Sequence, residues 1–216
     1  MPTYSIELDL SGRTVLVVGL GVVGARKATG LAEMGARVVG IDPAMDLKVP
    51  EGVEHRAEAF RPEHLEGAVL VFAASTPEVN RRVVAAAKAA GILVNTASEP
   101  ASGDFCLPAV WRDGPITLTI STSGASPALA RSLRDRASGA LAGASELALL
   151  LAEVRPMVLD RIEDTEKRRR LLNDLGDARW LDVLASEGAG AVRLAWLTAI
   201  KEAAHGRSLP GSPGIS

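Results

Sequence analysis

Residues 15–27 of the chain, VLVVGLGVVGARK, join four apolar residues to three glycines and then to a basic, helix-favouring run. The pattern predicts a β-strand, a tight turn and the start of an α-helix, with Gly19-x-Gly21-x-x-Gly24 in the turn. In such a turn the first glycine permits the bend, the second lets a pyrophosphate approach the backbone, and the third lets helix and strand pack closely. The N-terminus of the helix would then face the anion. The motif favours a dinucleotide site but is weak evidence by itself.

A second apolar segment supports this interpretation. Residues 36–41 (ARVVGI) follow a stretch of helical length and end at Asp42, where an acid that hydrogen-bonds the adenosine ribose is expected. An acid there favours NAD, because its charge would repel the 2′-phosphate of NADP. The alternative is an ordinary strand–helix–strand unit whose glycines only shape a turn. Because strand, glycines, helix, second strand and acid occur in order, we favour NAD binding.

The composition limits the classes of protein that fit. The chain has 216 residues and a formal net charge of −2, which gives no indication of nucleic-acid binding. Its single cysteine, Cys106, excludes an intrachain disulfide, and we expect it to be a small buried residue. The three histidines lack metal-ligand spacing, so no metal site is predicted. The N-terminus lacks signal-peptide features and no apolar run reaches membrane length, so we expect a cytoplasmic protein with no membrane partner.

Strands and helices alternate through the first half of the chain. Strands are predicted at residues 69–74 and 92–96, separated by a helix over residues 79–90 that Thr76 caps. The alternation predicts an α/β fold with a Rossmann-like parallel sheet, whose ligands bind at the carboxyl ends of the strands. A short edge strand is expected at residues 4–10.

The pattern changes after residue 105. Residues 116–122 (ITLTIST) alternate apolar and hydroxyl side chains, which predicts an antiparallel or half-exposed strand. Ser126 and Pro127 then begin a helix. Residues 145–204 are predicted to be almost wholly helical, with a kink or break at Pro156 and an interruption at residues 188–190.

Four segments, taken together, resemble a known family: GLGVVGARKATGLAEMGARV, VFAASTPEVNRRV, GILVNTASEPASGDFCLPAV and GPITLTISTSGASPALARSLR. In order and spacing they are similar to the precorrin-2 dehydrogenase / sirohydrochlorin ferrochelatase family, which also forms the N-terminal module of siroheme synthases. The resemblance covers about residues 5–141. It implies NAD-dependent oxidation of precorrin-2 to sirohydrochlorin, insertion of Fe²⁺ in some members, and a homodimer.

The resemblance also suggests how the chain is divided. It implies an NAD-binding Rossmann domain at residues 1–112, a dimerisation segment at 113–143 and a helical domain at 144–205 that helps to cover the tetrapyrrole. Residues 206–216 are rich in proline, glycine and serine, and we expect a disordered tail there.

Matching the family's motifs implies a set of ligand-binding residues. Those that would surround NAD are Gly19, Gly21, Val22, Val23, Gly24, Asp42, Pro43, Ala74, Ser75 and Asn95. Thr122 and Ser126 would lie in a hydroxyl-rich loop near the tetrapyrrole. Arg131, one helical turn beyond that loop, and the basic run at residues 167–170 could attract substrate carboxylates, although such runs are usually solvated helix faces.

One position departs from the family. Three residues after the asparagine that matches Asn95, the family commonly has an aspartate implicated in both dehydrogenation and chelation, whereas this chain has Ser98. A serine hydroxyl without an activating partner is a poor base. Glu99 and Asp104 lie in the same loop and could accept a proton instead, or could be a solvated residue and a turn cap. Ser98, Glu99 and Asp104 are therefore the candidate catalytic residues.

The leading hypothesis from the sequence is an NAD-dependent precorrin-2 dehydrogenase. One alternative is a bifunctional enzyme that also inserts iron through Glu99 or Asp104. The other is a non-catalytic NAD- or tetrapyrrole-binding module, in which loss of the acid accompanies loss of catalysis. Dehydrogenation can proceed with water as the proton acceptor, but chelation must remove two pyrrole protons, so the departure at Ser98 favours the dehydrogenase.

Overall fold

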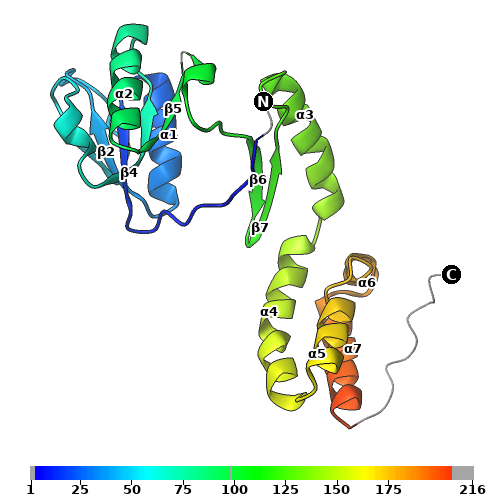
Figure 1. Ribbon diagram of the computed structural model, residues 1–216. Coiled ribbons are helices and arrows are strands. Elements are labelled where there is room, and N and C mark those ends of the chain that lie inside the picture. The colour runs from blue at the N-terminus through cyan, green and yellow to red at the C-terminus, as the bar shows by residue number, and fades with distance from the viewer. Residues whose placement is uncertain (1–2, 98, 206–216) are drawn as a thin grey trace. The chain divides into compact units, whose positions relative to one another are not determined.

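The computed structural model describes residues 3–97 and 99–205 and divides into two compact units between Leu107 and Pro108. In the described part of the first unit, parallel strands form a sheet of order β3-β2-β1-β4-β5 (Figure 1). The strands are β1 (Thr14–Val18), β2 (Arg37–Ile41), β3 (Val53–Arg56), β4 (Ala68–Ala73) and β5 (Leu93–Thr96). The chain leaves β1 towards β2 and later returns on the other side through β4. The carboxyl ends of β1 and β4 therefore flank the switch point where such sheets bind ligands.

The sheet is apolar on both faces because alternate residues point to opposite sides. Val15 and Val17 pack in one cluster with Ala28 of α1 (Val22–Glu33). Leu16 and Val18 pack in the other cluster, which includes α2 (Pro77–Ala89) and the short helix η1 (Pro62–Leu65). A second short helix, η2 (Pro100–Ser102), follows β5. Helices on both faces of the sheet confirm the predicted α/β fold. The packed sheet holds the glycine turn at the carboxyl end of β1.

The second unit begins with an antiparallel hairpin, β6 (Ala109–Asp113) and β7 (Ile116–Ile120). Helix α3 (Pro127–Ser138), which the short helix η3 (Gly139–Leu141) extends, packs against the hairpin. Nη1 of Arg134 on α3 donates a hydrogen bond to the carbonyl of Val110 on β6, at 3.2 Å. Every residue of the two strands is at least partly exposed. The residues of the hairpin are therefore at most half-buried in the part of the chain that the structure describes.

A helical bundle completes the second unit. Its members are α4 (Ala144–Arg161), α5 (Thr165–Leu175), α6 (Trp180–Glu187) and α7 (Ala189–Ala204). The fully buried Trp196 lies in the core, and its ring meets that of Trp180 edge to face, with centroids 5.7 Å apart. Within residues 3–97 and 99–205, no single helix is both long and apolar enough to cross a membrane, although the bent pair Pro127–Leu141 and Ala144–Arg161, at 54°, passes the length and composition test together.

Two local predictions are wrong, and the structure lacks a break that was one of two expectations at a proline. Residues 4–10 form no strand, because no strand in the described chain pairs with them, and the apolar side chains of Tyr4, Ile6 and Leu8 are exposed. Of the kink or break expected at Pro156, the break does not occur, because helix α4 continues through the proline with the buried residues Val154 and Val158 on either side. Cys106 is exposed, because it lies in the connection between β5 and β6 rather than in a strand.

The boundaries in the second half agree more closely with the sequence. An interruption does separate α6 from α7, at Gly188, as predicted. The sequence boundary at residue 112 falls inside β6, and the structure assigns this strand to the second unit because β6 pairs with β7. The predicted tail at residues 206–216 lies outside the described residues.

Candidate dinucleotide-binding site

The three glycines after β1 differ in what surrounds them. Gly19 has a φ of +91°, and a Cβ there would lie 2.7 Å from the backbone of Ala74 and Ser75. A Cβ on Gly24 would lie 1.7 Å from the carbonyl oxygen of Gly19. A Cβ on Gly21 would meet nothing within 4 Å. The first and third glycines therefore serve packing within the turn, while Gly21 leaves the backbone open to the space where a pyrophosphate would approach.

The N-terminus of α1 provides the complementary charge. Gly21 is the N-cap, no side chain caps the helix, and no acidic residue occupies its first turn. Val22 and Val23 begin the helix, and Val22 is almost fully exposed. Their backbone N–H groups have no partner one turn earlier in the helix and carry the positive end of its dipole. A phosphate group fits this environment.

Asp42 follows β2 and is joined to the glycine turn. Its Oδ2 accepts a hydrogen bond from the backbone N–H of Leu20 at 2.8 Å, and Oδ1 accepts one from the N–H of Ala44 at 3.0 Å. Pro43, the residue between these contacts, is exposed. Each carboxylate oxygen retains further acceptor capacity, so the half-buried Asp42 can still accept hydrogen bonds from ribose hydroxyls.

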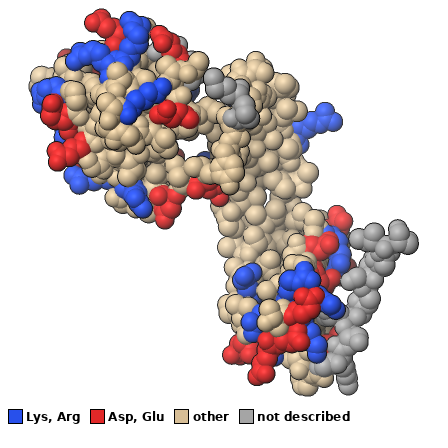
Figure 2. Space-filling view, viewed as in Figure 1, with Lys and Arg blue, Asp and Glu red and all other residues tan. Residues whose placement is uncertain are grey.

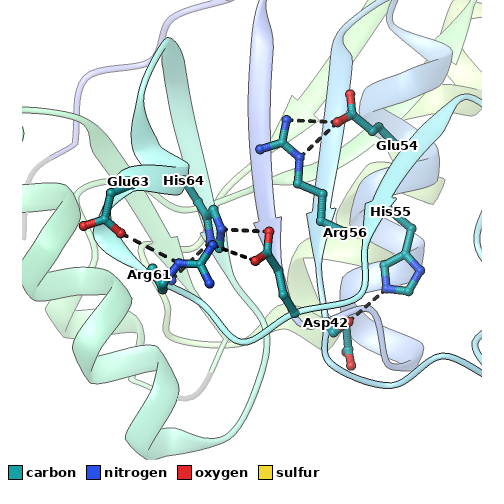
Figure 3. A network of polar contacts seen from close by, with 8 residues as sticks. Asp42, Glu54, His55, Arg56, Arg61, Glu63 and His64 are labelled. Atoms are coloured by element: carbon teal, nitrogen blue, oxygen red, sulfur yellow. Dashed lines mark hydrogen bonds and ion pairs between the residues drawn. The ribbon is translucent and has the colours of Figure 1, made fainter.

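A histidine supports Asp42 from the neighbouring strand. Nε2 of His55 on β3 lies 2.9 Å from the carbonyl oxygen of Asp42 (Figure 3). Because a carbonyl only accepts, His55 donates through Nε2. Arg56, the next residue, pairs with Glu54 at 2.9 Å, and its guanidinium therefore has a carboxylate partner already. The contact with the Arg56 guanidinium holds the pKa of the Glu54 carboxyl below its usual value.

The segment after β4 is fixed by a residue that sequence reasoning missed. Asn80 on α2 is 1% exposed, and its Oδ1 accepts a hydrogen bond from the N–H of Ser75 at 2.9 Å. Its Nδ2 donates to the carbonyl of Ser75 at 3.1 Å. Thr76 caps α2 through the N–H of Val79, as predicted, with Pro77 in the first turn. An asparagine four residues after a helix cap gives no sequence signal of such a clamp.

Asn95, expected near the cofactor, is buried at the end of β5. Its Oδ1 accepts a hydrogen bond from Nζ of Lys27 at 3.0 Å, and its Nδ2 donates to the carbonyl of Phe105 at 2.8 Å. Lys27 belongs to α1, 68 residues earlier in the chain. The side chain of Asn95 therefore connects the cofactor helix to the segment that follows the candidate catalytic loop.

The candidate catalytic residues have different surroundings. Ser98 lies outside the described residues. Glu99 is exposed, and its carboxylate lies 3.5 Å from the guanidinium of Arg81 on α2. Asp104 bonds twice to Val94, since its N–H donates to the carbonyl of Val94 at 2.8 Å and its Oδ2 accepts from the N–H of Val94 at 3.0 Å. Asp104 thus fastens the loop to the edge of β5, whereas the Glu99 carboxylate remains accessible to solvent.

The residues expected near the substrate belong to the second unit. Oγ1 of Thr122 lies 3.1 Å from both the N and the O of Ser126, and Oγ of Ser126 caps α3 through the N–H of Leu129. Arg131 is exposed on the same helix. Thr122 and Ser126 thus form a closed hydrogen-bonded loop at the start of α3.

The basic run at residues 167–170 has structural partners. Glu166 lies 2.8 Å from Arg169 and 2.9 Å from Arg170, and these hydrogen bonds lower the pKa of Glu166 to about 2. Arg168 donates to the carbonyls of Leu159 and Ile162 at the end of α4. This arrangement is the solvated, paired helix face that such runs usually form. In the part of the chain that the structure describes, no group of three His, Cys, Asp or Glu residues is placed to hold a metal.

The fold and the turn after β1 define an NAD(P)-binding protein of the Rossmann type, and sequence comparison agrees. Residues 6–109 match a family model described as putative NAD(P)-binding. Residues 113–136 match a second model, the central part of sirohaem biosynthesis proteins. The chain belongs to the family of the NAD(P)-binding module of siroheme synthases, which confirms the resemblance found in the sequence.

The relatives are longer than this chain. A siroheme synthase of Nitrosomonas eutropha is 36% identical over 177 residues, covering 78% of this chain and 37% of that protein. Siroheme synthase 1 of Aeromonas salmonicida is 33% identical and covers 100% of this chain and 49% of that protein. The chain thus spans less than half the length of these relatives. A solved structure described as SirC, precorrin-2 dehydrogenase, has the same fold, with a TM-score of 0.68, 24% identity and coverage of 93% of this chain and 100% of that one.

Proposed function

We propose that this protein oxidises precorrin-2 to sirohydrochlorin with NAD as the hydride acceptor. The observation that carries the proposal is the open backbone at Gly21, joined through Leu20 to the carboxylate of Asp42, in a member of the siroheme synthase family. The reaction removes one hydride and one proton from the tetrapyrrole, so that precorrin-2 and NAD⁺ give sirohydrochlorin, NADH and H⁺.

Residues of the first unit would hold the cofactor. The N–H groups of Val22 and Val23 would bind the pyrophosphate, and Asp42 would accept the hydrogen bonds of the adenosine ribose. Ala74 would line the middle of the cofactor together with Ser75, which Asn80 holds in place. When bound, NAD supplies the hydride acceptor for the substrate.

The preference for NAD over NADP rests on charge. The carboxylate of Asp42 would repel a 2′-phosphate, and the nearest arginine on β3, Arg56, is paired with Glu54. An NADP site of this type uses an arginine near the ribose to bind the additional phosphate. The described contacts therefore support NAD.

Glu99 is the better of the two carboxylates to receive the proton. The carboxylate of Asp104 already accepts the hydrogen bond that fastens the loop to Val94. The Glu99 carboxylate forms an exposed ion pair with Arg81. Exposed ion pairs stabilise a protein by about 0–1 kcal/mol, so the carboxylate can move away from Arg81 at little cost in free energy. Water can take the same proton, which is why dehydrogenation does not require an aspartate at position 98.

The second unit supports a homodimer. Leu129 and Leu133 on α3 are 50% and 42% exposed, and the residues of the hairpin are at most half-buried in the described chain. On the face drawn in Figure 2, few charged side chains lie over α3 and the hairpin, whereas charged groups gather on the first unit and on the helical bundle. A second copy of this chain would bury these apolar side chains.

An anaerobic assay tests the proposal. Purified protein is incubated with precorrin-2 and NAD while the absorbance of sirohydrochlorin and of NADH is followed, and Fe²⁺ is then added as the chelatase substrate. We expect NADH and sirohydrochlorin to form in equal amounts, with iron insertion no faster than in the absence of protein. Tight NAD binding without NADH formation would instead identify a binding module, and accelerated iron insertion would identify a bifunctional enzyme.

A further inference from the structure

Lys27 is a half-buried cation on α1 that the proposed reaction does not use. Its ammonium group lies 3.0 Å from Oδ1 of Asn95 and 5.1 Å from the centroid of the Phe72 ring. Burial, and to a lesser degree the charge of Arg26, lowers the pKa of Lys27. Among the described residues, no ion pair involves Lys27. Its polar partner is therefore a neutral amide, although a lysine at a helix surface could extend into water at no desolvation cost.

The chemistry of lysine sets the orientation of the Asn95 amide. An ammonium group has three donors and no acceptor, so only the oxygen of the amide can face it. The amide nitrogen is then directed away from Lys27, where it donates to the carbonyl of Phe105 at 2.8 Å. The ring of Phe105 in turn packs edge to face on Phe72, with centroids 5.4 Å apart. Lys27, Asn95, Phe72 and Phe105 thus form a closed set of contacts.

These contacts, together with a backbone hydrogen bond of Ala97, fix both ends of the candidate catalytic loop. At its start, Asn95 is buried in β5 and the N–H of Ala97 donates to the carbonyl of Ala73 on β4. At its end, Phe105 is held by the amide of Asn95. Lys27 lies in α1, the helix whose N-terminus would bind the pyrophosphate. The hydrogen bond between Lys27 and Asn95 therefore connects α1 to the candidate catalytic loop.

We propose that Lys27 is a positioning residue, which orients the amide of Asn95 and thereby anchors the segment at Phe105, the end of the candidate catalytic loop, beside the proposed cofactor site. Lys27 is not assigned a contact with substrate or a proton transfer. The kinetic part of the test below rests on the proposed function, whereas the structural part does not depend on any reaction.

Cys106 provides a specific probe of the loop anchor. It is the single cysteine of the chain, it is exposed, and it follows Phe105 directly. A nitroxide attached to Cys106 reports the mobility of this segment by electron paramagnetic resonance. We expect Lys27→Met to increase the mobility of the label, because the amide of Asn95 then loses one of the two hydrogen bonds that fix its orientation. Arg26→Met, which removes a charge from the exposed neighbouring position, should leave the spectrum unchanged.

A variant of the asparagine separates amide orientation from general packing. Asn95→Asp keeps an oxygen towards Lys27 but has no donor for the carbonyl of Phe105. We expect its label at Cys106 to be as mobile as in Lys27→Met. A label that remains immobile in Asn95→Asp, or in a folded Lys27→Met variant, overturns the proposal.

The kinetic arm compares the same variants with precorrin-2 and NAD. We expect Lys27→Met to lower kcat by about tenfold to a hundredfold, since misplacement of reacting groups by about 1 Å can cost about a hundredfold, while the Kd for NAD changes less than twofold. Lys27→Arg should recover part of kcat, because arginine also presents only donors. A tenfold loss of NAD affinity in Lys27→Met would mean that Lys27 acts on the cofactor and would contradict the proposal. If the wild-type protein forms no NADH, the label experiment still decides the role of Lys27.

Discussion

The carboxylate of Asp42 accepts a hydrogen bond from the backbone N–H of Leu20, so the acid at the end of β2 and the glycine turn after β1 form one structural unit. The distance between the two atoms is 2.8 Å, and a second backbone N–H, that of Ala44, binds the other carboxylate oxygen. A residue expected to select the cofactor by charge therefore also shapes the turn that receives the pyrophosphate. Substitutions at Asp42 should change both properties.

Two substitutions of Asp42 separate these properties. Asp42→Asn removes the charge but keeps one amide oxygen for the N–H of Leu20, so we expect the ratio of the Kd values for NADP and NAD to fall by about tenfold with little loss of thermal stability. Asp42→Arg should shift the preference further towards NADP but lower Tm, because both backbone N–H groups lose their acceptor. Calorimetric titration with each cofactor and a melting curve measure the two effects. An unchanged preference in both variants would refute the role of Asp42 in cofactor choice.

The glycine turn offers a matched pair of substitutions. In Gly24→Ala the new Cβ would lie 1.7 Å from the carbonyl oxygen of Gly19, so the turn must shift, and we expect a loss of about 1–3 kcal/mol in the free energy of unfolding. In Gly21→Ala the Cβ meets nothing within 4 Å, so stability should be retained while the methyl group obstructs the pyrophosphate and weakens NAD binding. Urea denaturation and NAD titration distinguish the two variants. Equal NAD affinity in Gly21→Ala and the wild type would contradict the assigned phosphate position.

Asn80 should be important for stability although it is not among the candidate catalytic residues. Asn80→Ala leaves the N–H and the carbonyl of Ser75 without their buried partner, and we expect a loss of about 1–3 kcal/mol in the free energy of unfolding. Asn80→Asp should be at least as harmful, because one carboxylate oxygen would face the carbonyl of Ser75. Arg82→Ala, at an exposed position of the same helix, is the control and should have no measurable effect. Equal stability of Asn80→Ala and Arg82→Ala would show that the clamp is dispensable.

The two described acids of the candidate catalytic loop should respond differently to removal of charge. Asp104→Asn keeps an oxygen that can accept from the N–H of Val94, so we expect activity close to that of the wild type. Glu99→Gln should lower kcat more than Asp104→Asn, by up to about a hundredfold if Glu99 rather than water receives the proton. Steady-state rates with precorrin-2 and NAD test the order of these effects. A larger loss in Asp104→Asn would assign the proton to Asp104 instead.

Glu166 should make stability depend on pH in the acid range. Its hydrogen bonds to Arg169 and Arg170 lower its pKa in the folded protein to about 2, below the ordinary value of 4.5. Because the folded-state pKa is depressed, the stabilising contribution is complete above the unfolded-state pKa and is lost as the pH falls from about 4.5 to about 2. The pair is exposed, so the contribution is small and salt-sensitive. Melting curves of Glu166→Gln and the wild type should differ slightly at neutral pH and converge near pH 2 at low salt; a constant difference would be evidence against the pair.

The sequence was sufficient to predict the parts of the fold that depend on local pattern. Gly19, Gly24 and Thr76 have the roles that their spacing indicated, because backbone conformation and helix caps are determined by a few neighbouring residues. The prediction of an edge strand at residues 4–10 was wrong. Alternation of apolar and polar residues shows that a segment could join a sheet, but it does not show that a partner strand is available. The helix continues through Pro156 because packing of its neighbours outweighs the local preference.

The contacts that fix the candidate site were beyond prediction from pattern. The bond between Lys27 and Asn95 joins residues 68 positions apart, and the clamp of Asn80 on Ser75 depends on how α2 packs against the sheet. Nothing in the composition of either segment distinguishes these polar side chains from solvated ones. They become recognisable only when burial and hydrogen-bond geometry are known.

The β6–β7 hairpin has a consequence for how the protein should unfold. A two-stranded sheet is marginally stable alone, and the residues of this one are at most half-buried in the described chain, although α3 packs against it and Arg134 donates a hydrogen bond to Val110. If a second copy covers the exposed side of the hairpin, then dissociation and melting of the hairpin become a single equilibrium. The apparent melting temperature of the second unit would then rise with protein concentration, while that of the sheet carrying the glycine turn would not.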